Sequence, residues 1–305
     1  MIKALKIILV VIIIAALGAM VFIASSDVQV NLETSWTPPD YETEGTVVEG
    51  LSAYEVFTQA LENYYNAENF IFMASFDFKA GLPPFVLATQ QTIEITKYQN
   101  GKVFHQVTKQ GTGLGKVNEG YRFYFDGENG YEINESSKDR FPALGTEDWS
   151  GLEYAAYENE EKTSAQEAEN IVNFSRYVIT PETLADTHND KVYQMGGKYY
   201  LSLTVNCLGI ETGTVQSVIE EAIIDGLGSN VVPGTLTWLQ DSVLTLEITK
   251  ISGQYYITAR RLSEKYQAKQ AGTGAVTSSE QYFSGTYAYT AGVSTITAEE
   301  LMNLA

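Results

Sequence analysis

Hydrophobic and polar residues alternate along much of the chain with the two-residue period of a β-strand. The clearest case is the run from Asn69 to Gly81. One parity of this run carries Phe70, Phe72, Ala74, Phe76 and Phe78. Successive side chains of a strand point to opposite faces, so one face of this strand is predicted to be aromatic and the other polar.

Short turn sequences separate further alternating runs. Asn100-Gly101 lies between two of them and is a strong hairpin signal, and Gly196-Gly197 and Ser252-Gly253 each separate another pair. Another strand is predicted to carry Tyr121, Phe123 and Phe125 on one face. These patterns predict several antiparallel hairpins in both halves of the chain.

Two amphipathic helices stand out between the strands. The first is predicted over residues 52–66, where Ser52 and Glu55 match a capping box and Val56, Ala60 and Tyr64 share a face. The second is predicted over residues 214–225. Shorter helices are expected in a polar insert at about 136–190 and at the C-terminus, with start signals at Ser164/Glu167, Thr180-Pro181 and Thr297/Glu300.

Strands and helices in this order predict an α+β fold. We expect an extensive, curved antiparallel β-sheet, packed by helices on one face, over residues 51–305. Residues 27–50 are acidic, contain Pro38-Pro39 and lack apolar periodicity. They are predicted to form an extended stalk ahead of the domain.

An uncharged segment, Ile7–Ala24, precedes the stalk and follows Lys3 and Lys6. As a helix its 18 residues would reach about 27 Å, close to the roughly 30 Å hydrocarbon core of a bilayer. Residues 1–26 are therefore interpreted as a transmembrane anchor with a cytoplasmic N-terminus and an extracytoplasmic C-terminal domain. The alternative is a signal peptide that is cleaved near Ser26, which would release a secreted protein.

The formal net charge is −19, which disfavours binding to nucleic acids because their phosphates are also negative. The chain has one cysteine, Cys207, so no intramolecular disulfide can form. The single-pass anchor and the acidic, disulfide-free domain suggest a bacterial cell-envelope protein.

Motifs for catalysis and metal binding are missing from the sequence. His105 and His188 lack neighbouring ligands at metal-binding spacing, and Gly111–Lys116 departs from the P-loop pattern because Gln110 and Val117 replace required residues. We therefore predict no cofactor, no metal site and a non-catalytic protein. A hydrolase with two paired carboxylates stays open, because such residues need only be close in space.

The aromatic strand faces are the candidate binding site. In one interpretation they line a cavity for an apolar ligand; in the other they are ordinary core beneath the helix at 52–66. The candidate cavity-lining residues are Phe70, Phe72, Phe76, Phe78, Phe123 and Phe125.

The order of elements resembles that of the lipoprotein-carrier half-barrels (LolA-like) and related exported bacterial lipid-binding domains. The resemblance rests on the helix Ser52–Asn66, the strand Asn69–Ala80, the Asn100-Gly101 hairpin and the strand Tyr121–Gly127. It implies a curved sheet that holds a lipid. It involves no sequence motif, so it assigns no functional residue.

Three functions follow as hypotheses. The first is a membrane-tethered extracytoplasmic protein that binds an apolar or amphiphilic ligand, with the membrane contacted through Ile7–Ala24. The second is a structural or interaction module of an envelope protein complex that presents tyrosine-rich strands to a protein partner. The third is the acid-pair hydrolase. The tyrosines of the second hypothesis are Tyr255, Tyr256, Tyr282, Tyr287 and Tyr289.

Overall fold

The structure is a computed structural model of the 305-residue chain. It describes residues 33–82, 85–112, 118–174, 190–205, 232, 235–269, 271–272 and 274–289.

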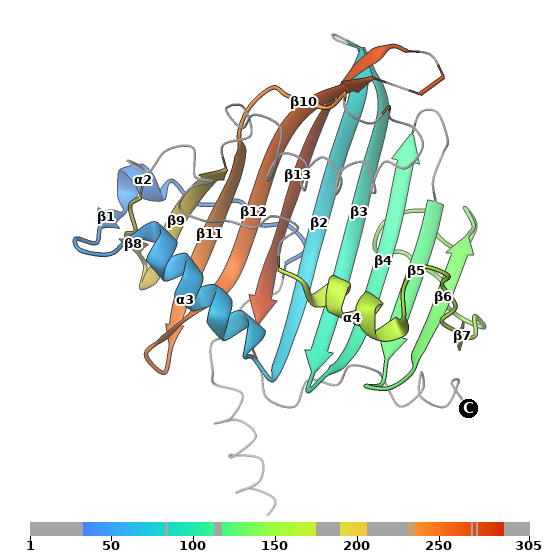
Figure 1. Cartoon of the computed structure of the whole chain (residues 1–305), viewed down its shortest axis with the longest axis horizontal. Coiled ribbons are helices and arrows are strands. Elements are labelled where there is room, and N and C mark those ends of the chain that lie inside the picture. Colours follow the sequence, from blue (N-terminus) through green and yellow to red (C-terminus); the bar gives the residue numbers. More distant parts are fainter. Residues whose placement is uncertain are drawn as a thin grey trace, which may run out of the picture. The chain divides into compact units, whose positions relative to one another are not determined.

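The described residues form a thirteen-stranded antiparallel sheet (Figure 1). Its order is β1 (Thr46–Val47), β8 (Tyr193–Met195), β9 (Lys198–Val205), β11 (Ser242–Ile251), β12 (Gln254–Lys269), β13 (Val276–Ala288), β2 (Asn69–Leu82), β3 (Phe85–Gln99), β4 (Lys102–Thr112), β5 (Asn118–Phe125), β6 (Gly130–Ser136) and β7 (Ala155–Ala156). A further strand, β10 (Thr237–Trp238), pairs with β12. The expected α+β architecture with an extensive antiparallel sheet is confirmed.

The predicted two-residue turns are confirmed. Asn100 and Gly101 have φ angles of 46° and 84°, so both adopt the left-handed conformation that a tight hairpin between β3 and β4 requires. Ser252 and Gly253 adopt the same left-handed conformation in the hairpin between β11 and β12, with φ angles of 51° and 86°. Gly196-Gly197 joins β8 to β9.

Two helices pack on the same face of the sheet, which we call the helix face. Helix α3 (Ala53–Tyr65) begins at Ser52, whose Oγ accepts a hydrogen bond from the Glu55 amide at 3.3 Å. Its buried side chains pack against β2, β9, β11 and β12. Helix α4 (Ser164–Val172) places Ala168 against β4 and β5. The helix predicted at 52–66 and its N-cap are therefore confirmed.

The capping box of α4 lies one residue earlier than the sequence pattern suggested. Thr163, not Ser164, is the N-cap: its Oγ1 accepts from the Gln166 amide at 3.2 Å, and Gln166 Oε1 accepts from the Thr163 amide at 2.9 Å. The prediction of a Ser164/Glu167 box was wrong. Two overlapping matches occur here, and the pattern alone does not distinguish between them.

Residues 33–44, expected to belong to an extended stalk, lie against the opposite face of the sheet, and Thr46–Val47 adds the edge strand β1. The Glu33 amide donates to Thr286 Oγ1 at 2.8 Å and the Trp36 amide to Ser284 Oγ at 3.1 Å, both on β13. Tyr41, in the short helix α2 (Tyr41–Glu44), is buried and stacks on Tyr200 with ring centroids 5.4 Å apart. This segment differs from the expected spacer because an aromatic side chain and backbone hydrogen bonds fix it to β9 and β13.

The first part of the polar insert also covers the opposite face, near β4–β6. Phe141 is fully buried and packs edge-on against Trp149 at 5.0 Å. A Cβ on Gly120 of β5 would lie 2.3 Å from the Phe141 ring, so this close approach requires glycine. The insert is therefore folded onto the sheet over residues 137–153.

Several predicted features fall outside the described residues: the Ile7–Ala24 segment, Cys207, His188, the helix at 214–225, and the starts at Thr180-Pro181 and Thr297/Glu300. Among the residues that are described, no helix has the length and apolar character needed to cross a bilayer.

Candidate functional site

Strand β2 places its predicted aromatic residues on the helix face, but in two different surroundings. Phe70 and Phe72 are 3% and 4% exposed, whereas Phe76 and Phe78 are half-buried. The predicted parity of the strand is therefore confirmed. The depth of burial changes along it.

The buried end lies beneath α3. The Phe72 ring stacks on Tyr287 of β13 at 4.3 Å, and the Phe70 ring lies 5.0 Å from Tyr64 of α3 and 5.3 Å from Tyr98 of β3. These contacts make Phe70 and Phe72 part of a solid aromatic core.

Phe123 and Phe125 belong to a second buried cluster, beneath α4. They pack with Val103 of β4 and Ala168 of α4, and Phe123 also meets Tyr157 edge-on at 5.2 Å. The structure thus distributes the six candidate residues over three surroundings rather than placing them around one space.

We call the half-buried part of the helix face the apolar strip and define it as Leu262, Phe283, Phe76 and Phe78. The register places Leu262 of β12 opposite Phe283 of β13, and Phe283 opposite Phe76 of β2. All four side chains are half-buried, and the Phe76 and Phe78 rings stack at 6.4 Å. The sequence did not single out Phe283 or Leu262, because only strand register places Phe283 beside β2 and Leu262 beside Phe283.

A buried polar row lies at one end of the apolar strip. Gln281 is opposite Phe78, and Glu264 of β12 is opposite Gln281. Glu264 is 1% exposed and accepts hydrogen bonds from Ser242 Oγ at 2.9 Å and from Gln281 Nε2. Apolar surface and hydrogen-bonding groups are therefore adjacent on the same face.

Arg260 lies at the other end of the apolar strip, at the edge of the aromatic core. Its guanidinium carbon is 4.6 Å from the ring centroids of Phe174 and Phe283 and 4.7 Å from that of Phe72. Its Nη1 also donates to the Phe174 carbonyl. These cation–π contacts hold a positive charge at the boundary between core and strip.

A cluster of carboxylates and tyrosines lies beside α4. Burial, with the nearby Glu167 carboxylate, raises the pKa of Glu132 above its usual value. Burial, with Glu167 and Glu132, likewise raises the pKa of the Tyr121 phenol. Glu132 and Glu167 are therefore two carboxylates that lie close enough to interact.

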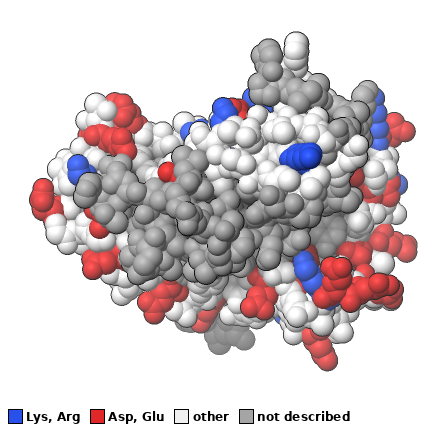
Figure 2. Space-filling model, turned by 45° about the horizontal axis from the view of Figure 1, so that its top comes forward, with Lys and Arg blue, Asp and Glu red and all other residues white. Residues whose placement is uncertain are grey.

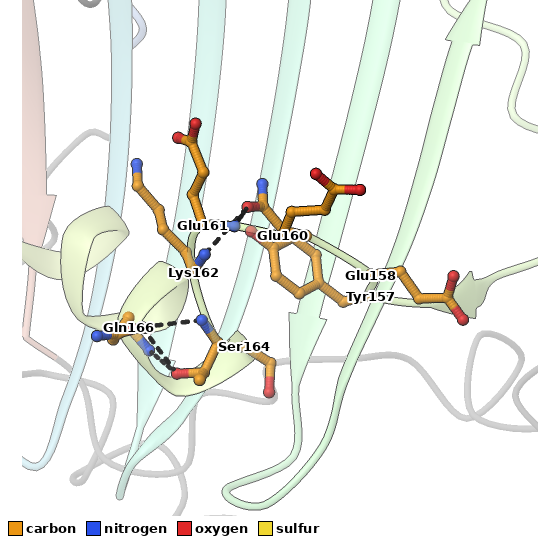
Figure 3. A pocket seen from close by; sticks show the side chains of 9 residues that line it. Tyr157, Glu158, Glu160, Glu161, Lys162, Ser164 and Gln166 are labelled. Carbon is orange, nitrogen blue, oxygen red and sulfur yellow. Dashed lines mark hydrogen bonds between the residues drawn. The ribbon is translucent and has the colours of Figure 1, made fainter.

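An open hollow of about 620 Å³ adjoins this cluster (Figure 3). One continuous segment lines it, from Tyr157 to the first turn of α4 at Gln166, and it includes Glu158, Glu160, Glu161 and Lys162. Its charged lining suits water and ions better than an apolar chain.

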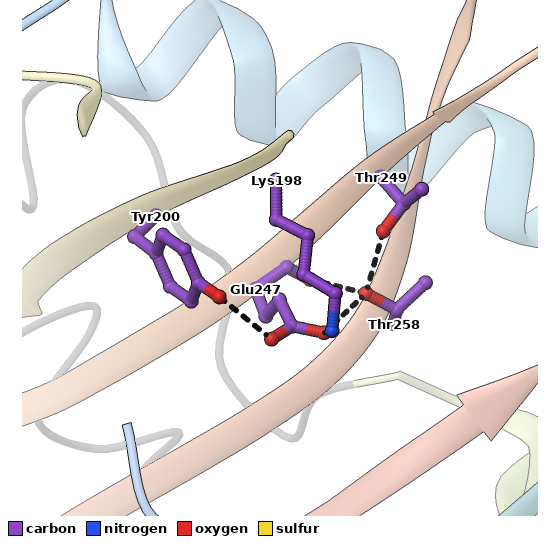
Figure 4. A network of polar contacts seen from close by, with 5 residues as sticks. All are labelled: Lys198, Tyr200, Glu247, Thr249 and Thr258. Atoms are coloured by element: carbon purple, nitrogen blue, oxygen red, sulfur yellow. Dashed lines mark hydrogen bonds and ion pairs between the residues drawn. The ribbon is translucent and has the colours of Figure 1, made fainter. Parts of the chain in front are cut away.

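A buried ionic group on the opposite face has all its partners within the sheet (Figure 4). Glu247 of β11 is 2.8 Å from Lys198 Nζ and accepts from Tyr200 Oη at 3.0 Å and Thr258 Oγ1 at 2.9 Å. Because its partners come from β9 and β12, this network joins three strands and has a structural role.

His105 is also part of the sheet interior. Its Nδ1 is 2.9 Å from Thr96 Oγ1 and 4.0 Å from Glu94 Oε1. Burial lowers its pKa, and Glu94 opposes that shift. The hydrogen bond to Thr96 joins β4 to β3, so His105 has a structural role here. Within the described ranges, no group of three or more His, Cys, Asp or Glu side chains is placed to hold a metal ion.

The tyrosines expected to form a contact surface are divided between core and surface. Tyr287 and Tyr255 are 1% and 8% exposed, so they cannot present a face to a protein partner. Tyr256, Tyr282 and Tyr289 are half-buried, and Tyr289 Oη donates to the Ile257 carbonyl at 3.0 Å. The prediction that Tyr255 and Tyr287 belong to a protein-contact surface was wrong, because α3 covers this part of the helix face.

Comparison with protein-family models and with curated proteins gives no match. A solved structure that concerns lipid–protein interactions in lipovitellin aligns with this chain at 11% sequence identity and a TM-score of 0.33. The alignment covers 75% of this chain and 26% of the lipovitellin chain. An N-terminal dehydratase from the difficidin assembly line covers 90% and 96% of the two chains at 11% identity, with a TM-score of 0.11. A dehydratase domain from the CurJ module of curacin polyketide synthase covers 85% and 97% at 10% identity, also with a TM-score of 0.11. Scores this low assign neither a fold family nor a function.

Proposed function

We propose that this protein binds an apolar or amphiphilic ligand on the apolar strip, and that Ile7–Ala24 tethers it to the outside of a cytoplasmic membrane. The observation that carries the proposal is the half-burial of Phe76, Phe78 and Phe283 on the face where Phe70 and Phe72 are closely packed. Aromatic side chains left partly accessible beside a packed core offer area that a ligand can cover.

The energetics suit a chain-like ligand. Each methylene group that leaves water contributes about 0.8 kcal/mol, so about ten of them contribute roughly 8 kcal/mol before the entropic cost of binding. The buried Gln281–Glu264 row at one end of the strip and Arg260 at the other supply polar groups for a headgroup. A fatty acid or another long-chain amphiphile has this combination of chemistry.

The proposal can be tested by photocrosslinking. The full chain, in lipid nanodiscs, is irradiated with a photoactivatable long-chain fatty acid, and the labelled peptides are mapped by mass spectrometry. Label is expected on peptides that contain β2 or β13. Phe76→Gln is expected to lower the labelling of these peptides by about tenfold, which corresponds to about 1.4 kcal/mol of binding free energy.

Ile93→Gln is the matched control. Ile93 is half-buried on β3, and its partner is Ser75, so it lies on the opposite face beside the same part of β2. Its labelling should stay within about twofold of wild type, since no ligand surface is removed. Equal losses in the two variants, or label spread over both faces, would rule out the apolar strip as the site.

A further inference from the structure

The connection between β2 and β3 has an unusual composition. Residues 81–87 read Gly-Leu-Pro-Pro-Phe-Val-Leu and contain no polar side chain. Hairpin connections normally carry Gly, Asn, Asp or Ser, because their backbone and side chains meet water. An apolar connection at the end of a sheet indicates contact with something other than water.

Two of these apolar side chains are exposed in the structure. Phe85 and Val86, at the start of β3, are 70% and 61% exposed. Val276, the first residue of β13, is 51% exposed and lies at the same end of the sheet, because Ser278 pairs with Gly81. We call Phe85, Val86 and Val276 the apolar tip; in Figure 1 this end of the sheet is at the top.

Exposed lysines lie near the apolar tip, although the whole chain has a net charge of −19. Residues 77–91 and 265–280, which form this end of the sheet, contain three lysines, one aspartate and one glutamate. Lys79 and Lys269 are exposed, whereas Lys265 forms an ion pair with Glu280. Figure 2 shows acidic side chains crowded at the left and lower right, while the upper middle of the view is mainly uncharged and carries basic side chains with an acidic group beside them.

We propose that the apolar tip docks onto the surface of a membrane that contains anionic lipids. Exposed phenylalanine and valine side chains can enter the boundary between headgroups and acyl chains, and flanking lysines attract anionic headgroups. A bilayer accepts such side chains without a shape-matched pocket. A protein–protein contact would need a larger apolar patch, surrounded by hydrogen-bonding groups.

This inference is independent of the proposed ligand site, because it uses none of the four side chains of the apolar strip. The docking contact can fail while the strip still binds a ligand, and the reverse also holds. The two experiments therefore report on different residues.

The test places a fluorescent reporter at the tip of the full chain. Phe85→Trp is reconstituted into phosphatidylcholine vesicles with or without phosphatidylglycerol, and the signal of the three native tryptophans in the unsubstituted protein is subtracted. Lipids brominated in their acyl chains should quench the added tryptophan. Quenching should be at least about twofold stronger with phosphatidylglycerol, and Lys79→Glu combined with Lys269→Glu should abolish this difference.

Val47→Trp serves as the positional control, since Val47 is an exposed apolar residue on the edge strand β1. Brominated lipids should not quench it. The proposal is overturned if Phe85→Trp is not quenched in any vesicle, if Val47→Trp is quenched equally, or if phosphatidylglycerol has no effect. A blue shift of Phe85→Trp that depends on protein concentration rather than on lipid would point to self-association and would also overturn it.

Discussion

Phe70 and Phe72 at the start of β2 and Phe76 and Phe78 further along it have the same chemistry and face the same side of the sheet, but only the first pair is fully covered. The first pair packs against Tyr64 of α3 and Tyr287 of β13. The second pair stays half-buried beside Phe283. Strand alternation therefore determines which side chains share a face, whereas elements distant in sequence determine which of them become core.

The largest expected effect tests this difference directly. Phe72→Ala should lower the free energy of unfolding by about 3–5 kcal/mol, because it opens a cavity in a closely packed core. Phe76→Ala should cost less than about 2 kcal/mol, because its side chain is already partly in water. Urea unfolding of the full chain in detergent, followed by circular dichroism, measures both. Equal costs would mean that the two ends of β2 do not differ in packing.

A smaller effect is expected at the boundary between the two regions. Arg260→Met should lower the free energy of unfolding by about 2 kcal/mol, since it removes the contacts with the Phe72, Phe174 and Phe283 rings and the bond to the Phe174 carbonyl. The same unfolding measurement applies.

Arg261→Met is its matched control. Arg261 is the next residue and lies on the opposite face, where its guanidinium carbon is 5.6 Å from the centroid of the Tyr282 ring. Its replacement should change the free energy of unfolding by no more than about 0.5 kcal/mol. If the two variants behave alike, the guanidinium of Arg260 does not stabilise the boundary.

The smallest expected effect concerns a charged group beside α4 and depends on pH. Burial and Glu167 raise the pKa of Glu132 above its ordinary value of 4.5, so the folded state holds this proton more tightly than the unfolded state. Stability from this group is therefore present below pH 4.5 and is lost as the pH rises through the folded pKa. Glu132→Gln should unfold at a higher temperature than wild type at pH 7 and at the same temperature at pH 4.

Glu135→Gln tests whether that result depends on location. Glu135 lies on the same strand, on the opposite face, where it pairs with Gly120. Its effect on the unfolding temperature should not change between pH 4 and pH 7. A similar pH dependence in both variants would indicate a general effect of net charge instead.

The sequence predicted the local parts of the fold. Ser52 marked the start of α3, the Asn100-Gly101 and Ser252-Gly253 turns were located correctly, and the parity of β2 was right. Each depends on residues within a few positions of one another, where backbone geometry and side-chain period act directly. The start of α4 was misplaced by one residue because two patterns overlapped.

The remaining features depend on long-range pairing and could not be predicted. Phe283 joins the apolar strip only because β13 pairs with β2, and Arg260 meets Phe174 only through the fold. Tyr41 was assigned to a spacer, yet its hydroxyl lies 2.6 Å from Ser202 Oγ, a contact between residues 161 positions apart. A single sequence contains no period or motif that reports such pairs.

The pairing of β2 with β13 also constrains how the protein is made. β2 ends at Leu82 and β13 starts at Val276, so the centre of the sheet cannot close until nearly the whole chain has left the ribosome. Such non-local pairing slows folding. Until β13 is made, the edge of β2 that carries Phe70 and Phe72 has no partner strand. During that interval the open edge of β2 is prone to aggregation, and a chaperone that shields apolar strands would protect it.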